Sequence, residues 1–359
     1  MTKESQWGLY LLRILNWNTR VLLERFLPGL EKSLRGQDAE LIVADNASED
    51  DSVPFLRDNW PDVGLIALDK NYGFTGGYNR ALAQVEADYY VLINSDVEVS
   101  DRWLQPLVSW MDSHPQCAVC GPKLHALKDR DSFEYAGAAG GLIDRWGFPF
   151  CRGRVMGRLE KDCGQYDDMK SSVLWVSGAC MMVRSSVWRE LGGLDENFFA
   201  HMEEIDFCWR AQLAGYDVDI VSRSMVWHLG GGTLPQGSPR KLKLNYRNNL
   251  LMLSKNLAGT YMCAGMEPAR ARRKAGRKLR LRMIIDRLTA IAYVLEFHIK
   301  DFRAVREAHR EFMSIRKNMP SAPAPVRTLP VSGIYRGSMI LASVLHRGKV
   351  FSYLRNKGV

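Results

Sequence analysis

The chain has 359 residues, 46% of them apolar and 25% charged, which is the composition of an ordinary globular protein with one large domain and an appendage, or with two domains. It contains no run of about 18 uncharged apolar residues and no signal-peptide core at its N-terminus, so we expect neither a membrane-spanning helix nor secretion. Seven cysteines at irregular spacing do not form the pattern of a disulfide framework, and we expect a cytoplasmic protein.

The first part of the chain predicts an alternation of short buried strands and helices. The expected strands are 9–15, 40–44, 63–68 and 89–93, and the expected helices are 19–34, 52–59 and 78–87. This alternation is typical of a parallel α/β sheet. Each strand ends in a polar cluster, and ligands bind at the carboxyl edge of such sheets.

The rest of the chain is less regular. Residues 121–172 predict an excursion of loops and short strands over the sheet edge. The elements expected after it are strands 173–183 and 218–226, helices 185–191 and 242–257, an acidic helix within 195–214, a basic helix over 267–318 and an apolar helix over 333–354. We therefore expect a catalytic domain at 1–257 and a basic helical extension at 258–359.

Charge divides the chain in a similar way. Residues 1–240 carry 24 Lys and Arg against 34 Asp and Glu, a net of −10, whereas residues 241–359 carry 25 against 6, a net of +19. This asymmetry indicates a nucleic-acid or membrane-surface partner for the basic part. Few aromatic residues interrupt its basic run, so stacking on nucleic-acid bases is not expected.

Three polar clusters follow predicted strands. The cluster 45–48, Asp-Asn-Ala-Ser, could accept hydrogen bonds from a ribose or a base, although taken alone it favours a turn that caps the next helix. The Gly-rich segment 71–79 could bring backbone N–H groups to a phosphate or sugar, and a tight strand–helix turn explains it equally well. The third cluster, 94–96, ends in Asp96, which could hold Mg²⁺ or Mn²⁺ against a diphosphate or could serve only as a turn residue.

An acidic block lies in the middle of the chain. Glu203, Glu204 and Asp206 follow the aromatic pair 198–199 and precede the apolar triplet 207–209. Carboxylates crowded at the edge of an apolar pocket have raised and separated pKa values, which suits a general base or a metal site. His228 follows the next strand and precedes a Gly run, so it could complete a metal shell with Asp96, although a lone His is usually structural.

In their order and spacing these motifs resemble glycosyltransferase family 2, whose members are inverting enzymes with the GT-A fold, over about residues 8–255. The matching residues are Asn16-Trp17-Asn18, Asp45, Asn46, Ser48, Asn71, Gly73, Phe74, Gly77, Asn79, Asn94, Asp96, the block 192–199, Glu203, Glu204, Asp206, Arg210 and His228. Within the family the chain is most similar to the bacterial rhamnosyltransferase-like branch that builds surface polysaccharides.

The resemblance implies a nucleoside-diphosphate-sugar donor and a role for each matching residue. The catalytic residues are Glu204, which is the favoured base, Glu203, which is the other candidate, and Asp206, which pairs with Arg210. Asp96 and His228 hold Mg²⁺ or Mn²⁺. Donor-binding residues are Asn16, Asp45, Asn71, Gly73, Phe74, Asn79, Asn94, Trp175 and Gly178. The sequence departs from the family pattern at Asn94, where a first Asp is frequent, and at Glu204, where Asp is common.

The basic tail suits this reading. Nine cations and one acid, Asp286, occur within 270–287, and the overlapping stretch 283–297 has apolar residues at helical spacing. A basic helix with an apolar face lies on anionic lipid, where each cation contributes about 1 kcal/mol. We therefore expect a cytoplasmic-membrane surface and a lipid-linked glycan acceptor as partners, with packing of the tail against the acidic domain as the alternative.

Two other functions remain open. A nucleotidyltransferase would share the sheet but needs a Gly-rich loop with Arg and Lys near the N-terminus, and the segment 16–20 has no Gly. A catalytically inactive glycosyltransferase-like binding protein, docked through its basic tail, would keep the fold without the chemistry. The presence of Asp96, Glu203, Glu204 and His228 argues against such decay.

Overall fold

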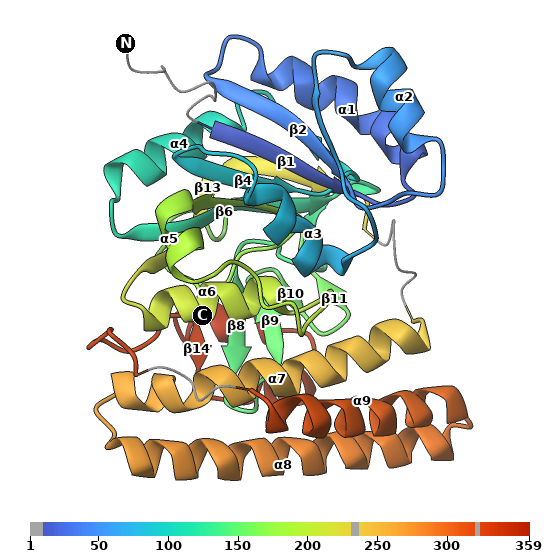
Figure 1. Ribbon diagram of the computed structural model, residues 1–359. Helices are drawn as coiled ribbons and strands as arrows, with labels where there is room; N and C mark the ends of the chain where they lie inside the picture. Colours follow the sequence, from blue (N-terminus) through green and yellow to red (C-terminus); the bar gives the residue numbers. More distant parts are fainter. Residues whose placement is uncertain (1–9, 231–236, 320–323) are drawn as a thin grey trace.

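The computed structural model describes residues 10–230, 237–319 and 324–359. A nine-stranded mixed sheet in the order β3-β2-β1-β4-β12-β6-β13-β5, with β7 beside β6, forms the centre of the molecule (Figure 1). Its strands are β1 Tyr10–Asn16, β2 Ala39–Asp45, β3 Gly64–Ala67, β4 Tyr89–Ile93, β5 Val97–Val99, β6 Cys117–Ala126, β7 Asp129–Phe133, β12 Cys180–Arg184 and β13 Asp217–His228.

Strands β1 to β4 run parallel, whereas β12 pairs antiparallel with both β4 and β6, and β5 pairs antiparallel with β13. Helices cover both faces of the sheet, and accordingly β4 has no charged residue and β12 has one only at its end, Arg184. The predicted mixed, mainly parallel α/β sheet is confirmed, and the polar clusters that end β1, β2 and β4 meet at one edge.

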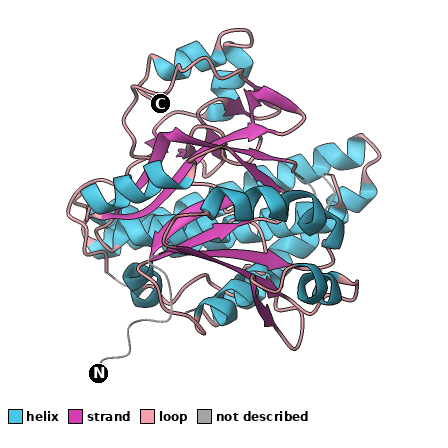
Figure 2. Cartoon of the chain, turned by 90° about the horizontal axis from the view of Figure 1, so that it is seen from above, coloured by secondary structure: helices cyan, strands magenta, loops and turns pink. Residues whose placement is uncertain are grey.

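Two layers of helices enclose the sheet (Figures 1 and 2). The apolar faces of α1 and α4 pack in one buried cluster, and those of α3, α5 and α6 pack in another. The helices are α1 Arg20–Leu34, α2 Ser52–Asn59, α3 Gly73–Leu82, α4 Leu104–Ser113, α5 Ser185–Glu190 and α6 Glu203–Leu213. Helix α6 carries the acidic block, so its packing against the sheet decides where the acids lie.

The excursion contains a second sheet in the order β11-β10-β9-β8-β14. Its strands are β8 Gly141–Asp144, β9 Pro149–Cys151, β10 Arg154–Val155, β11 Arg158–Leu159 and β14 Ile334–Tyr335. Strand β14 comes from the end of the chain and pairs in parallel with β8. The prediction of one apolar helix over 333–354 is therefore wrong. The segment forms β14, α10 Met339–Leu345 and α11 Val350–Arg355. Helix α10 starts anew because Asp144 and Ser338 accept hydrogen bonds from its first N–H groups.

Three helices form a further layer below α6 (Figure 1): α7 Pro239–Cys263, α8 Pro268–Leu295 and α9 Ile299–Lys317. Helix α7 begins earlier than expected because Ser238 caps it and Pro239 occupies its first turn. The basic helix expected over 267–318 is two helices, since Phe297 adopts a left-handed φ of 60° that ends α8. The proposed boundary at 257 falls inside α7. Within the described ranges no helix is both long and apolar enough to cross a membrane.

Candidate active site

The turns that end β1 and β2 are joined by side-chain hydrogen bonds. Asn16 Nδ2 donates to Asp45 Oδ2 at 2.8 Å, and Asp45 Oδ1 accepts from the backbone N–H of Ser48 at 2.9 Å. Thr19 Oγ1 donates to Asn16 Oδ1. Asn16 and Asp45 are 0% and 1% exposed and do not line the pocket described below. These hydrogen bonds are the ones expected if the two residues only stabilise turns. That Asn16 or Asp45 contacts a sugar-nucleotide donor stays a prediction.

The Gly-rich segment 71–79 holds the loop that leads into α6. Gly73 has a left-handed φ of 71°, and a Cβ there would lie 2.5 Å from the Phe199 ring. The N–H of Phe74 donates to the Phe199 carbonyl oxygen at 2.8 Å. Asn79 is also occupied within the protein, because its side chain exchanges hydrogen bonds with the backbone of Leu194. Asn79 therefore supports the acidic loop and does not face the pocket.

A pocket of about 510 Å³ lies at this sheet edge, between the strand ends, the excursion and the α7–α8 layer. Most of the predicted site residues line it. They are Asn71, Gly73, Phe74, Asn94, Asp96, Trp175, Gly178, Glu203, Glu204 and His228. Gly178 passes close to Glu204, since an added Cβ would lie 3.4 Å from the Glu204 Cβ. The fold thus brings together motifs that the sequence separates by up to 157 positions, from Asn71 to His228.

The two glutamates begin α6 at the wall of this pocket. Glu203 is 5% exposed and Glu204 is partly exposed, and each has one buried carboxylate oxygen without a hydrogen-bond partner among the described residues. Burial, together with the charges of Glu204 and Asp206, raises the pKa of Glu203 well above its usual range. Burial raises the pKa of Glu204 to about 7. Near neutral pH Glu204 is therefore balanced between its two forms, and burial favours the protonated form of Glu203 relative to an ordinary glutamate.

Asp206 has a different environment from the two glutamates. It is fully buried, away from the pocket lining, and accepts hydrogen bonds from Arg210 at 2.8 Å, Lys255 at 2.7 Å and Asn256 at 2.8 Å. The predicted i,i+4 pair with Arg210 is confirmed. Because all its partners are internal, Asp206 holds α6 against α7, and the structure gives it no access to a substrate.

Asp96 and His228 converge from the ends of β4 and β13. Asp96 Oδ1 lies 3.1 Å from His228 Nε2, and both residues are mostly buried. On the other side of the imidazole, Nδ1 lies 3.4 Å from Glu134 Oε1. Burial alone would lower the pKa of His228, but the adjacent carboxylates of Asp96 and Glu134 raise it to about 10. A carboxylate oxygen and an imidazole nitrogen suit Mn²⁺ or Mg²⁺ with phosphate oxygens as further ligands.

Within the described residues no group of three or more His, Cys, Asp or Glu side chains could hold a metal ion. Of these residues, Asp96 and His228 would supply two ligands, and a diphosphate and water would supply others. Glu134 fits the pattern of a carboxylate that orients a ligand histidine.

Sequence reasoning missed several residues of the pocket, because they lie far from the motifs or carry no pattern of their own. Glu134 belongs to the irregular excursion. His201 stands within the acidic block, where burial and the charge of Lys241 lower its pKa to about 4, so its imidazole is neutral at pH 7. The other missed side chains that could contact a ligand are Tyr135, Arg154, Arg240, Lys241, Tyr246, Asn249 and Arg282.

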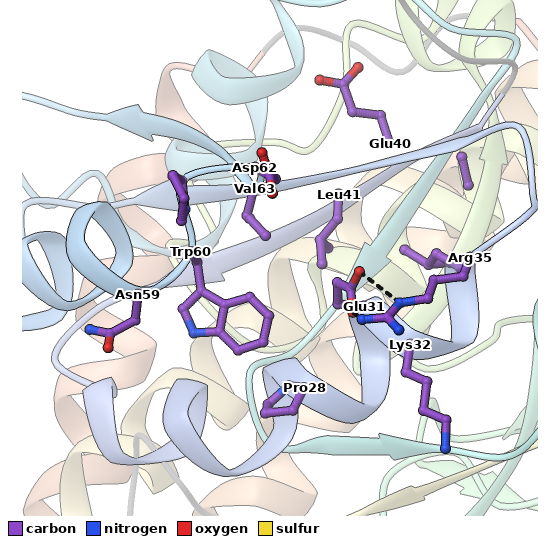
Figure 3. A pocket seen from close by; sticks show the side chains of 13 residues that line it. Pro28, Glu31, Lys32, Arg35, Glu40, Leu41, Asn59, Trp60, Asp62 and Val63 are labelled. Carbon is purple, nitrogen blue, oxygen red and sulfur yellow. Dashed lines mark hydrogen bonds and ion pairs between the residues drawn. The ribbon is translucent and has the colours of Figure 1, made fainter.

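A second cavity, of about 580 Å³, lies elsewhere (Figure 3). Pro28, Leu41 and Trp60 line it, and Arg35 is hydrogen-bonded to Glu31 at its rim. It is formed by α1, the start of β2 and the segment after α2, so it is at the amino end of the strand and not at the edge where the polar clusters meet. It contains none of the predicted site residues.

Comparisons with known proteins identify what the chain is similar to. Residues 16–171, which are less than half of the chain, match the model of Glycosyl transferase family 2. The chain is 25% identical over 260 residues to N-acetylglucosaminyl-diphospho-decaprenol L-rhamnosyltransferase of Mycobacterium tuberculosis, covering 66% of this chain and 81% of the relative. It is 27% identical over 247 residues to dTDP-rhamnosyl transferase RfbF of Shigella flexneri, covering 64% and 76%.

Solved structures share the fold. GalNAc-T7, solved with UDP, GalNAc and Mn²⁺, superposes with a TM-score of 0.54 at 15% identity and covers 70% of this chain and 48% of its own. The mannosyltransferase PcManGT of Pyrobaculum calidifontis, solved with GDP-Man and Mn²⁺, gives 0.50 at 11% identity and covers 87% and 91%. The fold is therefore of the GT-A glycosyltransferase type.

Proposed function

On the basis of the match to family 2, we propose that the chain is an inverting glycosyltransferase. It moves a sugar, with rhamnose as the first candidate, from a nucleoside diphosphate to a hydroxyl of a lipid-linked glycan. Both relatives reported above are rhamnosyltransferases by name, which supports the choice of rhamnose, and the name of the Mycobacterium tuberculosis relative supports a lipid-linked acceptor. The observation that carries the proposal is that Glu204 and the Asp96–His228 pair line one pocket.

Glu204 is the base in this reaction. The pKa of a sugar hydroxyl lies far above 7, so its proton must leave as the oxygen attacks the anomeric carbon. A carboxylate with a pKa of about 7 accepts that proton at neutral pH and is more basic than an ordinary glutamate. The new bond forms on one face of the sugar while the nucleoside diphosphate leaves from the other with the electron pair, and the anomeric configuration inverts.

Asp96 and His228 act on the leaving group. They would hold Mg²⁺ or Mn²⁺, which supplies positive charge beside the departing diphosphate. Mn²⁺ accompanies the nucleotide in both structural neighbours, and we extend a divalent cation to this chain on that basis and on its donor atoms. Trp175, which is held by a 3.1 Å bond from its Nε1 to the Leu142 carbonyl oxygen, gives the sugar pocket a fixed wall.

The outer face of α8 supports the part of the proposal that concerns the membrane. Five large apolar side chains recur at intervals of three and four residues and are 48–75% exposed: Leu281, Ile284, Leu288, Ile291 and Leu295. The same helix line continues toward the N-terminus with the exposed cations Arg273 and Arg277. A face that is cationic in one half and apolar in the other suits anionic lipid at the inner face of the cell membrane, and this stripe is not packed on the acidic domain.

Release of nucleoside diphosphate from a panel of dTDP-, UDP- and GDP-sugars tests the function. We would supply a membrane lipid extract as acceptor, vary Mg²⁺ and Mn²⁺, and compare the wild type with Asp96→Ala. Cation-dependent turnover of one donor, lost in the variant, supports the proposal and identifies the sugar. If the folded protein binds no donor and turns none over, the inactive binding protein becomes the better description.

A further inference from the structure

One wall of the pocket carries positive charge that the proposed transfer does not use. Arg154 in β10 and Arg240 and Lys241 in the first turn of α7 line the same pocket as Glu204 and Asp96. They come from the excursion and from the helical layer, so no single sequence motif contains them. Because side chains from two separate elements converge there, the charge belongs to the pocket and not to one exposed helix face.

Arg154 is the strongest of these observations. It is only 7% exposed, yet among the described residues it has no carboxylate within 4.0 Å. Its guanidinium lies 4.5 Å from the Tyr135 ring centre, and its one hydrogen bond runs from Nη2 to the thiol of Cys151 at 3.7 Å. Its Nε has no partner among the described residues. A thiol is a weak acceptor, so this buried cation lacks the anion that its burial requires.

Lys241 repeats the pattern. It is partly buried, and burial lowers the pKa of its ammonium group. No carboxylate of the described residues lies within ion-pair distance of its Nζ. The neighbouring cations behave differently, since Lys243 and Arg247 both pair with Glu311. Two other cations of α7 are thus matched with an acid, whereas Arg154 and Lys241 of the pocket are not matched with one that the structure describes.

We propose that Arg154 and Lys241 bind a phosphate group of the acceptor, so that the acceptor is a glycan attached to its lipid through phosphate. The inference rests on the proposed function, and it names the chemical group by which the acceptor is recognised. A buried guanidinium and a partly buried ammonium group fit a phosphate monoester or diphosphate, whose oxygens accept several charge-assisted hydrogen bonds. Arg240, which lies 5.8 Å from the Phe199 ring centre, adds charge at the same wall.

The position of this wall agrees with an acceptor that arrives from a membrane. Helix α8 lines the pocket through Arg282 on its buried face and carries the apolar stripe on its outer face. Arg282 itself is matched by Asp286 at 2.8 Å and holds the Gly147 carbonyl oxygen, so it shapes the wall without offering free charge. Arg154, Arg240 and Lys241 thus line the same pocket as a residue of the helix that carries the proposed lipid-facing stripe.

Two acceptors that differ only in phosphate test the proposal. One is N-acetylglucosamine linked through diphosphate to a short prenyl chain, and the other is a prenyl N-acetylglucosaminide without phosphate. For each enzyme we would measure kcat/KM with both acceptors and report their ratio. We expect the ratio to fall about 10- to 100-fold in Arg154→Gln and in Lys241→Gln, the size of one lost charge-assisted hydrogen bond. Arg154→Lys should retain part of the wild-type preference for the acceptor that carries the diphosphate.

Arg145→Gln is the matched control, because Arg145 is an exposed cation of the same small sheet that does not line the pocket, and its ratio should equal that of the wild type. An unchanged ratio in both pocket variants overturns the subsite. A rise in donor KM with either acceptor assigns the cations to the donor diphosphate and also overturns the proposal. Lys241 is only partly buried, so its variant keeps the test valid if Arg154→Gln does not fold.

Calorimetric titration of the prenyl diphosphate acceptor into the protein without donor separates this inference from the proposed function. If the wild type binds this probe and both variants bind it at least tenfold more weakly, the subsite stands even where no transfer is detected. If transfer occurs but the probe binds wild type and variants equally, the transferase stands and the subsite does not.

Discussion

The side-chain amide of Asn248 in α7 donates a hydrogen bond of 2.7 Å to the carbonyl oxygen of His201, two residues before Glu203. The same amide also donates to the carbonyl oxygens of Phe198 and Ala200. The loop it holds is strained, since Phe199, His201 and Met202 all have φ between 63° and 71°. A helix from the basic part of the chain therefore fixes the loop that places Glu203 and Glu204.

We predict that Asn248→Ala lowers kcat more than it raises KM for the donor. Without the amide the left-handed residues relax, and the start of α6 shifts by enough to misplace Glu204, so a loss of about tenfold or more is expected. The loss of buried hydrogen bonds should cost about 1–3 kcal/mol of the free energy of unfolding. Steady-state kinetics and urea unfolding measure the two effects.

Thr260→Val is the matched control for this change. Thr260 is also in α7 and accepts a 2.8 Å hydrogen bond from Trp209 of α6, but it is far along both helices from the acidic loop. It should lower stability with little effect on kcat. If the two variants reduce kcat equally for the same loss of stability, α7 supports only the fold and not the placement of the acids.

The second prediction concerns the pH dependence of the rate. Because the base must be deprotonated and burial raises the pKa of Glu204 to about 7, kcat/KM should rise with pH, about tenfold per pH unit below 7, and level off above it. Glu204→Gln should remove this limb and reduce kcat by about 10²- to 10⁴-fold. Rates measured from pH 5 to pH 9 at saturating cation test this. A flat profile in the wild type would exclude Glu204 as the base.

Particular residues show how far the sequence could lead. That Asp96 and His228 share one pocket could be predicted because each follows a strand, and such strands end at one sheet edge. Glu203 and Glu204 begin a helix, and only the order of the motifs along the chain associated them with this edge. The choice between the two glutamates needed burial, since only the structure shows that Glu203 is the more deeply enclosed.

Other features had no local signal. Asn16, Asp45 and Asn79 carry the right chemistry for donor binding, but their atoms are used within the protein, and no pattern distinguishes the two cases. Glu134 and Arg154 lie in a segment without periodicity and reach the pocket only through long-range pairing. The division proposed at residue 257 followed composition. Charged residues indicate which face of α7 is exposed, but they do not indicate that its buried face packs on α6. The domain division at residue 257 remains a prediction.

A third prediction concerns lipid binding. Leu288→Glu and Ile291→Glu replace side chains that are 62% and 54% exposed on the outer face of α8. Each loses about 1.5–3 kcal/mol of apolar transfer and adds repulsion from anionic headgroups, so partition onto phosphatidylglycerol vesicles should weaken more than tenfold. Leu341→Glu, a 56% exposed residue of α10, is the control. If all three variants bind vesicles as well as the wild type in flotation assays, the apolar stripe of α8 contacts a partner other than lipid. A change in the oligomeric state of the α8 variants would identify that partner as a second copy of this chain.

The fourth prediction is that Glu203→Gln stabilises the protein at alkaline pH. Burial and the adjacent acids raise the pKa of Glu203 in the folded state, whereas the unfolded chain ionises near pH 4.3. Between these two values the folded state binds the additional proton, so wild-type stability falls as pH rises. Glutamine has nearly the same shape as glutamate but does not ionise, so the variant lacks this contribution to the pH dependence of stability. The difference in Tm between variant and wild type should therefore grow in favour of the variant from pH 5 to pH 8. If the difference in Tm does not change with pH, Glu203 ionises normally in the folded protein. Both glutamates could then act as a base at neutral pH, and the structural reason for choosing Glu204 would be lost.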